Sequence, residues 1–292
     1  KETVEGVTFI IANTDLQDLT TANADVKIQL GQELTGGRGS GAKPEVGKKA
    51  AQESKKEIED ALQGAHMVFI TCGEGGGTGT GAAPVIAEIA QNLGALTIAV
   101  VTKPFSFEGK SRMKNAQIGI EELRKHVDSL IVVPNDNLET LIDKNTPVLQ
   151  AFGEVDNVLR QSVQSISDLI NFPGDINLDF SDITTTMKDS GTAVIGIGVG
   201  TGEDRAIQAA KQAVQSPLLE KSIVGATKAI INITGGSNLT LYETKQAVKI
   251  IESYAQTDLN VFYGTIINKN ISDDQIIVTV IATGFEDYEK AP

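Results

Sequence analysis

Short β-branched apolar runs alternate with helical stretches along the first half of the chain. The runs at residues 7–12, 66–72, 96–102 and 130–133 are bounded by polar residues, Gly or Pro. Between them, residues 47–62, 82–93 and 110–126 have the length and pattern of helices. Strands that are apolar on both faces and alternate with helices are typical of βαβ units. The sequence therefore predicts an α/β domain built on a parallel sheet.

A long helix and a smaller domain are predicted to follow. Apolar residues recur at three- and four-residue steps across 151–171, a helix of about 30 Å that Pro173 and Gly174 end. Residues 175–182 are expected to form a loop. Strands are predicted at 193–199, 229–233, 259–267 and 275–282, and helices at 203–214 and 241–254. The last two strands have no helix between them, so an antiparallel hairpin in an α+β domain is expected.

Charge and cysteine content exclude several classes of function. The chain of 292 residues has 25 basic and 38 acidic side chains, a formal charge of −13. Nonspecific binding to nucleic acid or anionic membranes depends on many Lys and Arg contacts, so neither is expected as a partner. No apolar stretch approaches the roughly 20 residues that membrane insertion needs. Cys72, the single cysteine, cannot form an internal disulfide, which favours a reducing cytoplasm.

Residues 73–81 contain six Gly and two Thr, directly after a predicted strand and before a predicted helix. Gly lets backbone amides approach a ligand closely, and a helix start adds unpaired N–H groups, so the segment is predicted to bind an anion. The Walker A pattern is not met. A dinucleotide-binding fingerprint lacks its acidic residue about 20 positions on, where Thr102, Lys103 and Pro104 stand. Both common nucleotide loops are therefore disfavoured.

The heptapeptide GGGTGTG at 75–81 resembles the signature of the tubulin/FtsZ family. The segments 101–109, 126–130, 134–136 and 177–182 are similar to bacterial FtsZ rather than to eukaryotic tubulin. The resemblance runs over nearly the whole chain. It implies a parallel-sheet GTPase domain of tubulin/FtsZ type, a long central helix and a smaller α+β C-terminal domain. The expected boundaries are 1–150 for the GTP-binding domain, 151–173 for the central helix, 174–190 for a synergy loop and short helix, and 191–292 for the C-terminal domain.

The resemblance also implies a binding site for GTP or GDP. The loop residues would hold the α- and β-phosphates: Gly75, Gly76, Gly77, Thr78, Gly79 and Thr80. Gly41 and Ala42 would sense the γ-phosphate, and Asn13 and Asp15 would lie beside the nucleotide. Glu108 would bind the ribose with Arg112 near it, Asn135 and Asp156 would read guanine, and Phe152 would stack on the base. Without the family, Glu108 and Arg112 are equally well explained as a surface ion pair, and Phe152 is better explained as a core residue.

Asn177, Asp179 and Asp182 resemble the synergy loop that completes GTP hydrolysis. Two carboxylates three residues apart could orient a water and help to place Mg²⁺. The alternative is helix capping, since Ser181 and Asp182 precede the helical stretch 183–188. The predicted long helix separates this loop from the base-reading residues by about 30 Å. The loop is therefore expected to act on the nucleotide of a neighbouring subunit, which produces an open head-to-tail filament.

The expected function is that of a cytoplasmic cell-division GTPase that binds GTP with Mg²⁺ and forms a ring at the division site. Its expected partners are further copies of itself, and adaptor and regulatory proteins that bind a C-terminal peptide. A non-hydrolysing scaffold of the same fold is the alternative, and an NAD(P) oxidoreductase lacks its acidic ribose residue. Two departures stand out: Lys43 replaces the family's usual Asn, and the chain begins at the family's second strand. Without the first strand and first phosphate loop, weak GTP binding and impaired turnover are expected.

Overall fold

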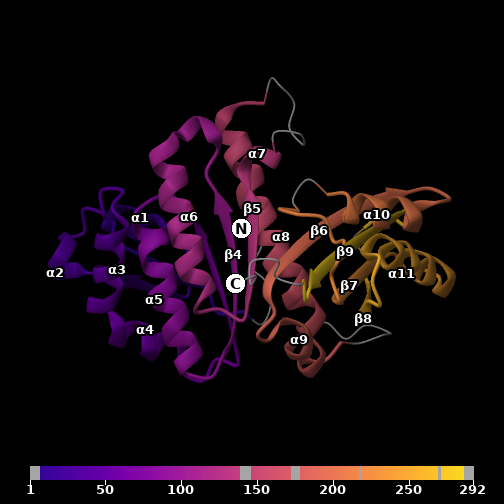
Figure 1. Cartoon of the computed structure of the whole chain (residues 1–292), viewed down its shortest axis with the longest axis horizontal. Coiled ribbons are helices and arrows are strands. Elements are labelled where there is room, and N and C mark those ends of the chain that lie inside the picture. Colours follow the sequence, from indigo (N-terminus) through magenta and orange to yellow (C-terminus); the bar gives the residue numbers. More distant parts are fainter. Residues whose placement is uncertain (1–6, 139–145, 172–177, 217–218, 269–270, 286–292) are drawn as a thin grey trace, which may run out of the picture. The chain divides into compact units, whose positions relative to one another are not determined.

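The computed structural model describes the chain apart from residues 1–6, 139–145, 172–177, 217–218, 269–270 and 286–292. The chain forms two compact units, Lys1–Asp136 and Asn137–Pro292. Figure 1 labels most of their helices and strands. No helix in the described part is long and apolar enough to cross a membrane.

The first unit is built from parallel strands and the helices that connect them. β3, β4 and β5 are parallel neighbours, with Met67 opposite Leu96 and Ile98 opposite Ser129. All but the last residue of β4 is buried, as expected for a strand covered on both faces. In chain order the unit contains β1 (Ile10–Asn13), α1 (Leu16–Thr21), β2 (Val26–Gln29), α2 (Gln32–Thr35), α3 (Pro44–Glu53), α4 (Lys55–Leu62), β3 (Met67–Gly73), α5 (Thr78–Asn92), β4 (Leu96–Lys103), the 3₁₀ turn η1 (Ser106–Glu108), α6 (Lys110–Arg124) and β5 (Ser129–Pro134).

Three features of this unit differ from the sequence prediction. β1 pairs with β2, a strand the periodicity missed, in a two-stranded parallel sheet of its own. The helix predicted at 47–62 is divided at Ser54 into α3 and α4. The helix predicted from residue 82 begins at Thr78, so the second half of the glycine-rich segment is its first turn. One apolar core nevertheless joins β2, β3, β4 and β5 with α3, α4, α5 and α6.

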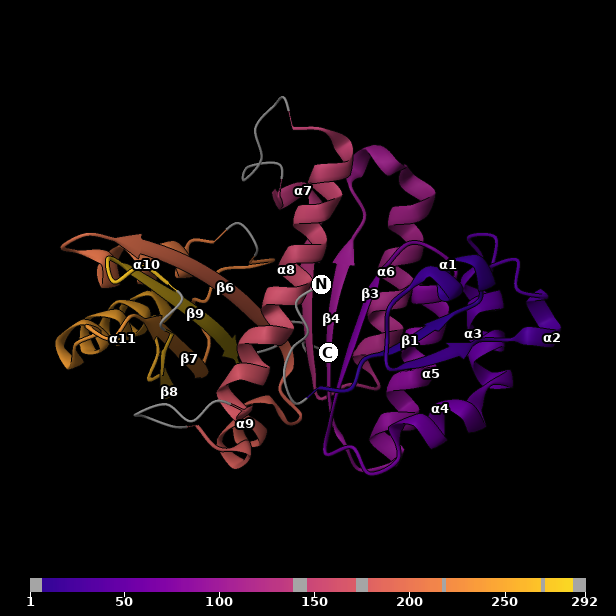
Figure 2. The same cartoon turned by 180° about the vertical axis from the view of Figure 1, so that it is seen from behind.

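The second unit joins a long helix to a domain with its own sheet, in the strand order β6-β9-β7-β8. Figure 2 shows α9 beside the carboxyl-terminal end of α8. The short helix α7 (Asn135–Leu138) spans the boundary between the units. The elements that follow it are α8 (Val148–Asn171), α9 (Phe180–Met187), β6 (Gly191–Thr201), α10 (Arg205–Val214), β7 (Lys228–Gly235), α11 (Leu241–Ala255), β8 (Asn260–Ile267) and β9 (Gln275–Thr283).

The predicted hairpin of the last two strands is wrong. β7 lies between β8 and β9: it is parallel to β8 and antiparallel to β9. β9 also pairs with β6, which makes it a central strand, and seven of its nine residues are buried. Only two of the eight residues of β8 are buried, and this strand lies at the edge of the sheet. Two strands joined through a helix, as β7 and β8 are through α11, tend to pair in parallel, and this tendency outweighs the short connection to β9.

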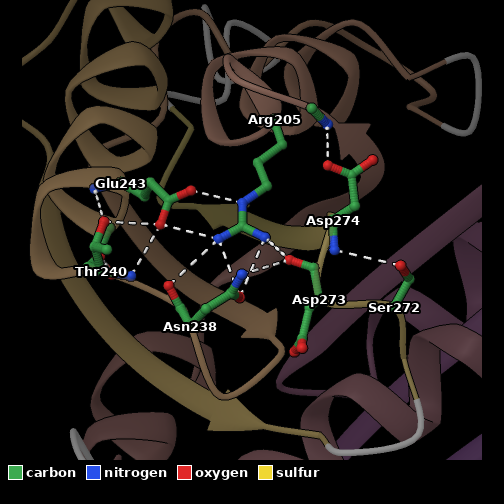
Figure 3. A network of polar contacts seen from close by, with 9 residues as sticks. Arg205, Asn238, Thr240, Glu243, Ser272, Asp273 and Asp274 are labelled. Carbon is green, nitrogen blue, oxygen red and sulfur yellow. Dashed lines mark hydrogen bonds and ion pairs between the residues drawn. The ribbon is translucent and has the colours of Figure 1, made fainter.

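A buried arginine ties the helices of this domain together, as Figure 3 shows. Arg205 begins α10, is 6% exposed, and donates from Nε to Glu243 Oε1 of α11 at 2.6 Å. Its guanidinium also contacts Asn238 Oδ1 and the backbone carbonyl of Asp273, just before β9. Glu243 completes a capping box with Thr240 at the start of α11. The network therefore fixes α10, α11 and the entry to β9 at one end of the sheet.

Candidate functional site

The glycine-rich segment forms a turn from β3 into α5. Gly75 has φ +102°, a conformation that L side chains rarely adopt. Gly77 is the N-cap of α5, and as a glycine it makes no side-chain hydrogen bond to the N–H groups of the first turn. A Cβ added at Gly76 would meet nothing within 4 Å. The predicted anion cradle therefore combines the N-terminus of a helix with open space beside Gly76.

Close backbone contacts fix this turn against α3 and the preceding loop. An added Cβ would lie 2.2 Å from Ser40 Oγ at Gly77 and 2.0 Å from the Pro44 carbonyl oxygen at Gly81. In the reverse direction, a Cβ at Gly47 of α3 would lie 2.2 Å from the Gly77 carbonyl oxygen. Glycine is required here because two backbones touch, which is a packing role distinct from ligand approach.

Three hydroxyl groups meet at the start of α5. Thr78 Oγ1 lies 2.6 Å from Thr14 Oγ1 and 3.1 Å from Ser40 Oγ. The sequence predicted Thr78 as a binding residue, and Ser40 lies in the 39–42 segment that resembles the loop sensing the γ-phosphate. Thr14 stands between two residues that were predicted, but nothing in the sequence indicates that it packs onto a helix 64 positions away. The cluster links the β1 loop and the 40–43 loop to the candidate phosphate loop.

The residues around these loops have clear local roles. Asp15 Oδ1 caps α1 by accepting from the backbone N of Gln17 at 2.9 Å, and Asn13 Oδ1 accepts from Asp15 N at 3.2 Å. Gly41 and Ala42 have φ values of +59° and +58°. Two successive left-handed residues, one of them an alanine, make a strained turn of the kind found at functional sites.

Glu108 and Arg112 form the ion pair that was the alternative explanation for them, at 3.1 Å. They do not share one helix: Glu108 ends the turn η1, and Gly109 at φ +105° separates it from α6. Glu108 Oε1 also accepts from Phe105 N at 2.9 Å, and its side chain is 13% exposed. The pair leaves Arg112 half exposed beside the turn.

Asn135 is the clearest orphaned polar group among the predicted site residues. It is 5% exposed, and its Oδ1 has no hydrogen-bond partner among the described residues. A buried acceptor without a donor calls for an explanation, and a bound ligand that supplies an N–H group would provide one.

Phe152 and Asp156 lie in the second unit, one turn apart on α8, and both are exposed. Phe152 is 39% exposed, so its explanation as a core residue is wrong. Residues four apart on a helix share a face, so the ring and the carboxylate are neighbours.

Asp179 and Asp182 form a reciprocal capping box. Asp179 Oδ1 accepts from Asp182 N at 2.9 Å, and Asp182 Oδ2 accepts from Asp179 N at 3.1 Å. The helix begins at Phe180, so the predicted cap is displaced to Asp179. Together the two bonds use one oxygen of each carboxylate. Asn177 lies outside the described residues.

Glu74 is a site residue that sequence analysis missed. It lies inside the glycine-rich segment and is 2% exposed, and its Oε2 has no hydrogen-bond partner in the part of the chain that the structure describes. Burial raises the pKa of Glu74 from 4.5 to about 7, against the opposing effect of hydrogen bonds from Cys72 and Thr80. Burial and the neighbouring Glu74 also raise the pKa of Cys72 well above its usual value, which keeps the thiol protonated.

Comparison with known proteins places these features in one family. The model for the Tubulin/FtsZ family, GTPase domain, matches residues 2–143, and the model for the FtsZ family, C-terminal domain, matches residues 191–286. An empty FtsZ dimer structure from M. jannaschii is 45% identical, with a TM-score of 0.91, over 96% of this chain and 81% of that one. A mutant FtsZ of the same organism is also 45% identical, with a TM-score of 0.92, over 97% and 85%.

A more distant structure shows the fold alone. CetZ2 from Haloferax volcanii, solved as a GTPγS-bound protofilament, is 20% identical with a TM-score of 0.80, over 96% of this chain and 85% of that one. The family models match a GTPase domain and a separate C-terminal domain, and the FtsZ structures match nearly the whole of this chain. The chain therefore belongs to the tubulin/FtsZ family of GTPases, on its FtsZ side.

Proposed function

We propose that this chain binds and hydrolyses GTP and polymerises head to tail, with each active site completed by the next subunit. The observation that carries the proposal is the length of α8. Phe152 lies near the start of α8, and Asn171 at its end is 19 positions further along the chain. At a rise of about 1.5 Å per residue, the two positions are about 28 Å apart. Asp179 and Asp182 follow beyond that end. A group that contacts the base and a group that activates water cannot therefore serve the same nucleotide from one molecule.

The phosphate site of the proposal is the turn between β3 and α5. Gly76 offers open space, the first turn of α5 offers N–H groups, and Thr78 with Ser40 offers hydroxyl donors. These neutral donors suit a chain with a charge of −13, in which the binding of an anion cannot rest on excess Lys and Arg. Asn135, Asp156 and Phe152 are proposed to bind the guanine base, and Glu108 with Arg112 the ribose.

The proposed chemistry depends on positioning and on charge. Asp179 and Asp182 of one subunit would orient the attacking water at the γ-phosphate of the next, which suits phosphoryl transfer. Mg²⁺ would neutralise charge on the phosphates. No group of three or more His, Cys, Asp or Glu among the described residues could hold a metal ion. Mg²⁺ is commonly bound through substrate phosphates and water, so its proposed place is at the phosphates of the nucleotide.

In this contact the nucleotide site of one subunit faces the Asp179 and Asp182 loop of the next, so the two contacting surfaces differ. Repetition of such a head-to-tail contact without ring closure builds an open filament. We propose that this filament acts in the cytoplasm, in a ring at the site of cell division. Adaptor proteins that bind a C-terminal peptide are the proposed link to the membrane.

Turnover against protein concentration tests the shared site. GTPase activity per subunit should be low in dilute protein and rise cooperatively above a threshold concentration. Asp182→Ala should bind GTP with unchanged affinity and lose turnover at every concentration. Activity that is independent of concentration, or normal turnover in Asp182→Ala, would contradict the proposal. Binding without turnover in the unsubstituted chain would favour a non-hydrolysing scaffold, in which the two carboxylates serve only as a cap.

A further inference from the structure

Glu74 is a carboxyl group inside a loop that is proposed to bind phosphate. Its side chain reaches three neighbouring elements. Cys72 Sγ of β3 donates to Glu74 Oε1 at 3.4 Å, and Thr80 of α5 hydrogen-bonds the carboxyl group. On α6, a Cβ added at Gly119 would lie 2.4 Å from Glu74 Oε2, so the helix backbone closes over that oxygen.

The carboxyl group is linked to the phosphate loop through Thr80. The Gly75 backbone N donates to Thr80 Oγ1 at 2.8 Å, while the Thr80 hydroxyl bonds to Glu74. The Glu74 backbone N donates to the Thr102 carbonyl oxygen of β4 at 2.9 Å, which anchors the residue to the sheet. Movement of the Glu74 side chain would therefore displace Thr80 and with it the left-handed residue Gly75.

The surroundings of Glu74 favour its neutral form. A carboxylate is an acceptor only, and here its donors among the described residues are the weak thiol of Cys72 and the hydroxyl of Thr80, with none at Oε2. The titratable group that faces it is Cys72, on β3. Thr80 of α5, Thr102 of β4 and Gly119 of α6 are uncharged, and Arg112 of α6 turns its backbone carbonyl toward Gly75 while its guanidinium pairs with Glu108.

We propose that Glu74 is a positioning residue whose protonated carboxyl group holds the glycine-rich loop in its binding geometry, so that nucleotide binding takes up a proton. The inference rests on nucleotide binding at this loop. An ionised Glu74 would need water at Oε2, which requires the loop to open, and it would also repel the phosphates. By linkage, a bound nucleotide must favour the protonated carboxyl group to the same extent as the proton favours the nucleotide.

Calorimetry with GDP measures this uptake directly. Titrations at pH 8 in two buffers with different ionisation enthalpies give the number of protons taken up per GDP bound. In the chain without nucleotide the pKa of Glu74 is about 7, so most of these carboxyl groups are ionised at pH 8. If the nucleotide-bound chain holds Glu74 protonated, the uptake should approach one proton per GDP. GDP affinity should be roughly eightfold weaker at pH 8 than at pH 6.5, beyond the change caused by the ionisation of GDP itself.

Glu74→Gln is the informative variant, because the amide keeps the shape of the side chain and cannot ionise. It should take up no proton and should lose the extra pH dependence. Glu121→Gln, at an exposed position of α6, is the matched control and should behave as the unsubstituted chain. Proton uptake that persists in Glu74→Gln would overturn the inference.

Two measurements do not depend on the folding of Glu74→Gln. Absence of proton uptake in the unsubstituted chain would itself refute the role of Glu74, while GDP binding would still support the proposed function. Failure to bind GDP at either pH would contradict the proposed function. Cys72→Ser replaces a weak donor by a stronger one, so the pH midpoint of binding should move to lower pH. If the pH midpoint of GDP binding were the same in Cys72→Ser, a group other than Glu74 would cause the pH dependence, and the inference would be refuted.

Discussion

The contact between α3 and α5 predicts the effect of one added methyl group. In Gly81→Ala the new Cβ would lie 2.0 Å from the Pro44 carbonyl oxygen, and ordinary contact begins at 3.4 Å, so α3 must retreat by 1.4 Å. Overpacking of this kind costs up to about 3 kcal/mol, while replacing a helical Gly by Ala returns about 1 kcal/mol. A net loss of about 2 kcal/mol in the free energy of unfolding is expected.

The same substitution should weaken nucleotide binding, because α3 begins directly after the 40–43 loop. A retreat of Pro44 would stretch the contact of 3.1 Å between Ser40 and Thr78 at the start of α5. The assays are chemical denaturation for stability and fluorescence titration with a labelled GDP for affinity. Both quantities should fall together in Gly81→Ala.

Gly76→Ala is the matched control in the same segment. Its Cβ meets nothing within 4 Å, and its φ is not in the left-handed range, so stability should change by less than about 0.5 kcal/mol. Its methyl group would enter the proposed phosphate cradle, so GDP affinity should still fall. Equal stability of Gly81→Ala and Gly76→Ala would refute the packing argument, and unchanged GDP affinity in Gly76→Ala would refute the placement of the cradle.

Three other predictions follow from single contacts. Arg205→Met leaves the Glu243 carboxylate without its buried cation and should cost about 3–5 kcal/mol in the free energy of unfolding, measured by denaturation. Hydrogen bonds from Arg205 and Thr240 outweigh the effect of burial and lower the pKa of Glu243, so this stabilisation should be lost as the pH falls through that pKa. Asp179→Ser keeps an N-cap but removes a carboxylate, so stability should hold within about 0.5 kcal/mol while GTPase activity is lost; a stable, active variant would show that Asp179 only caps. Because the pKa of Glu74 is raised by folding, its carboxyl group ionises at lower pH in the unfolded chain than in the folded chain. The free energy of unfolding should therefore decline by about 3 kcal/mol between pH 4.5 and pH 7. A denaturation series in which Glu74→Gln shows the same decline would contradict this.

The sequence predicted the parts of the fold that depend on local pattern. The turn from β3 into α5 follows from glycines between an apolar run and a helix, and β4 follows from a continuous apolar run. The short connection from β8 to β9 predicted that these two strands pair, but they do not. β9 is a buried strand that pairs with β6 on one side and with β7 on the other, and this arrangement cannot be predicted from the length of a connection. β2 escaped notice because four residues carry too little periodicity.

The sequence predicted the part of the candidate site that consists of consecutive residues. It did not predict the residues that packing brings to the site from other parts of the chain. The glycine-rich loop is continuous in the sequence. Thr14 and Ser40 reach Thr78 only because the β1 loop and α3 fold against α5. Glu74 looks like an exposed loop residue until α6 covers it through Gly119. For Asp179 and Asp182, the sequence offered both a cap and a water-activating pair, and the capping bonds are what the structure contains.

Mixing two inactive variants tests the central claim, a site shared between subunits, most directly. Asp182→Ala retains the proposed nucleotide site and lacks the activating carboxylate, whereas Asp156→Ala lacks the base contact and retains that carboxylate. In a head-to-tail filament of both, about a quarter of the joints would pair an intact nucleotide site with an intact Asp182. The account predicts that the equal mixture regains up to about a quarter of the unsubstituted GTPase activity, although each variant alone is inactive. A mixture no more active than its components would contradict the shared site.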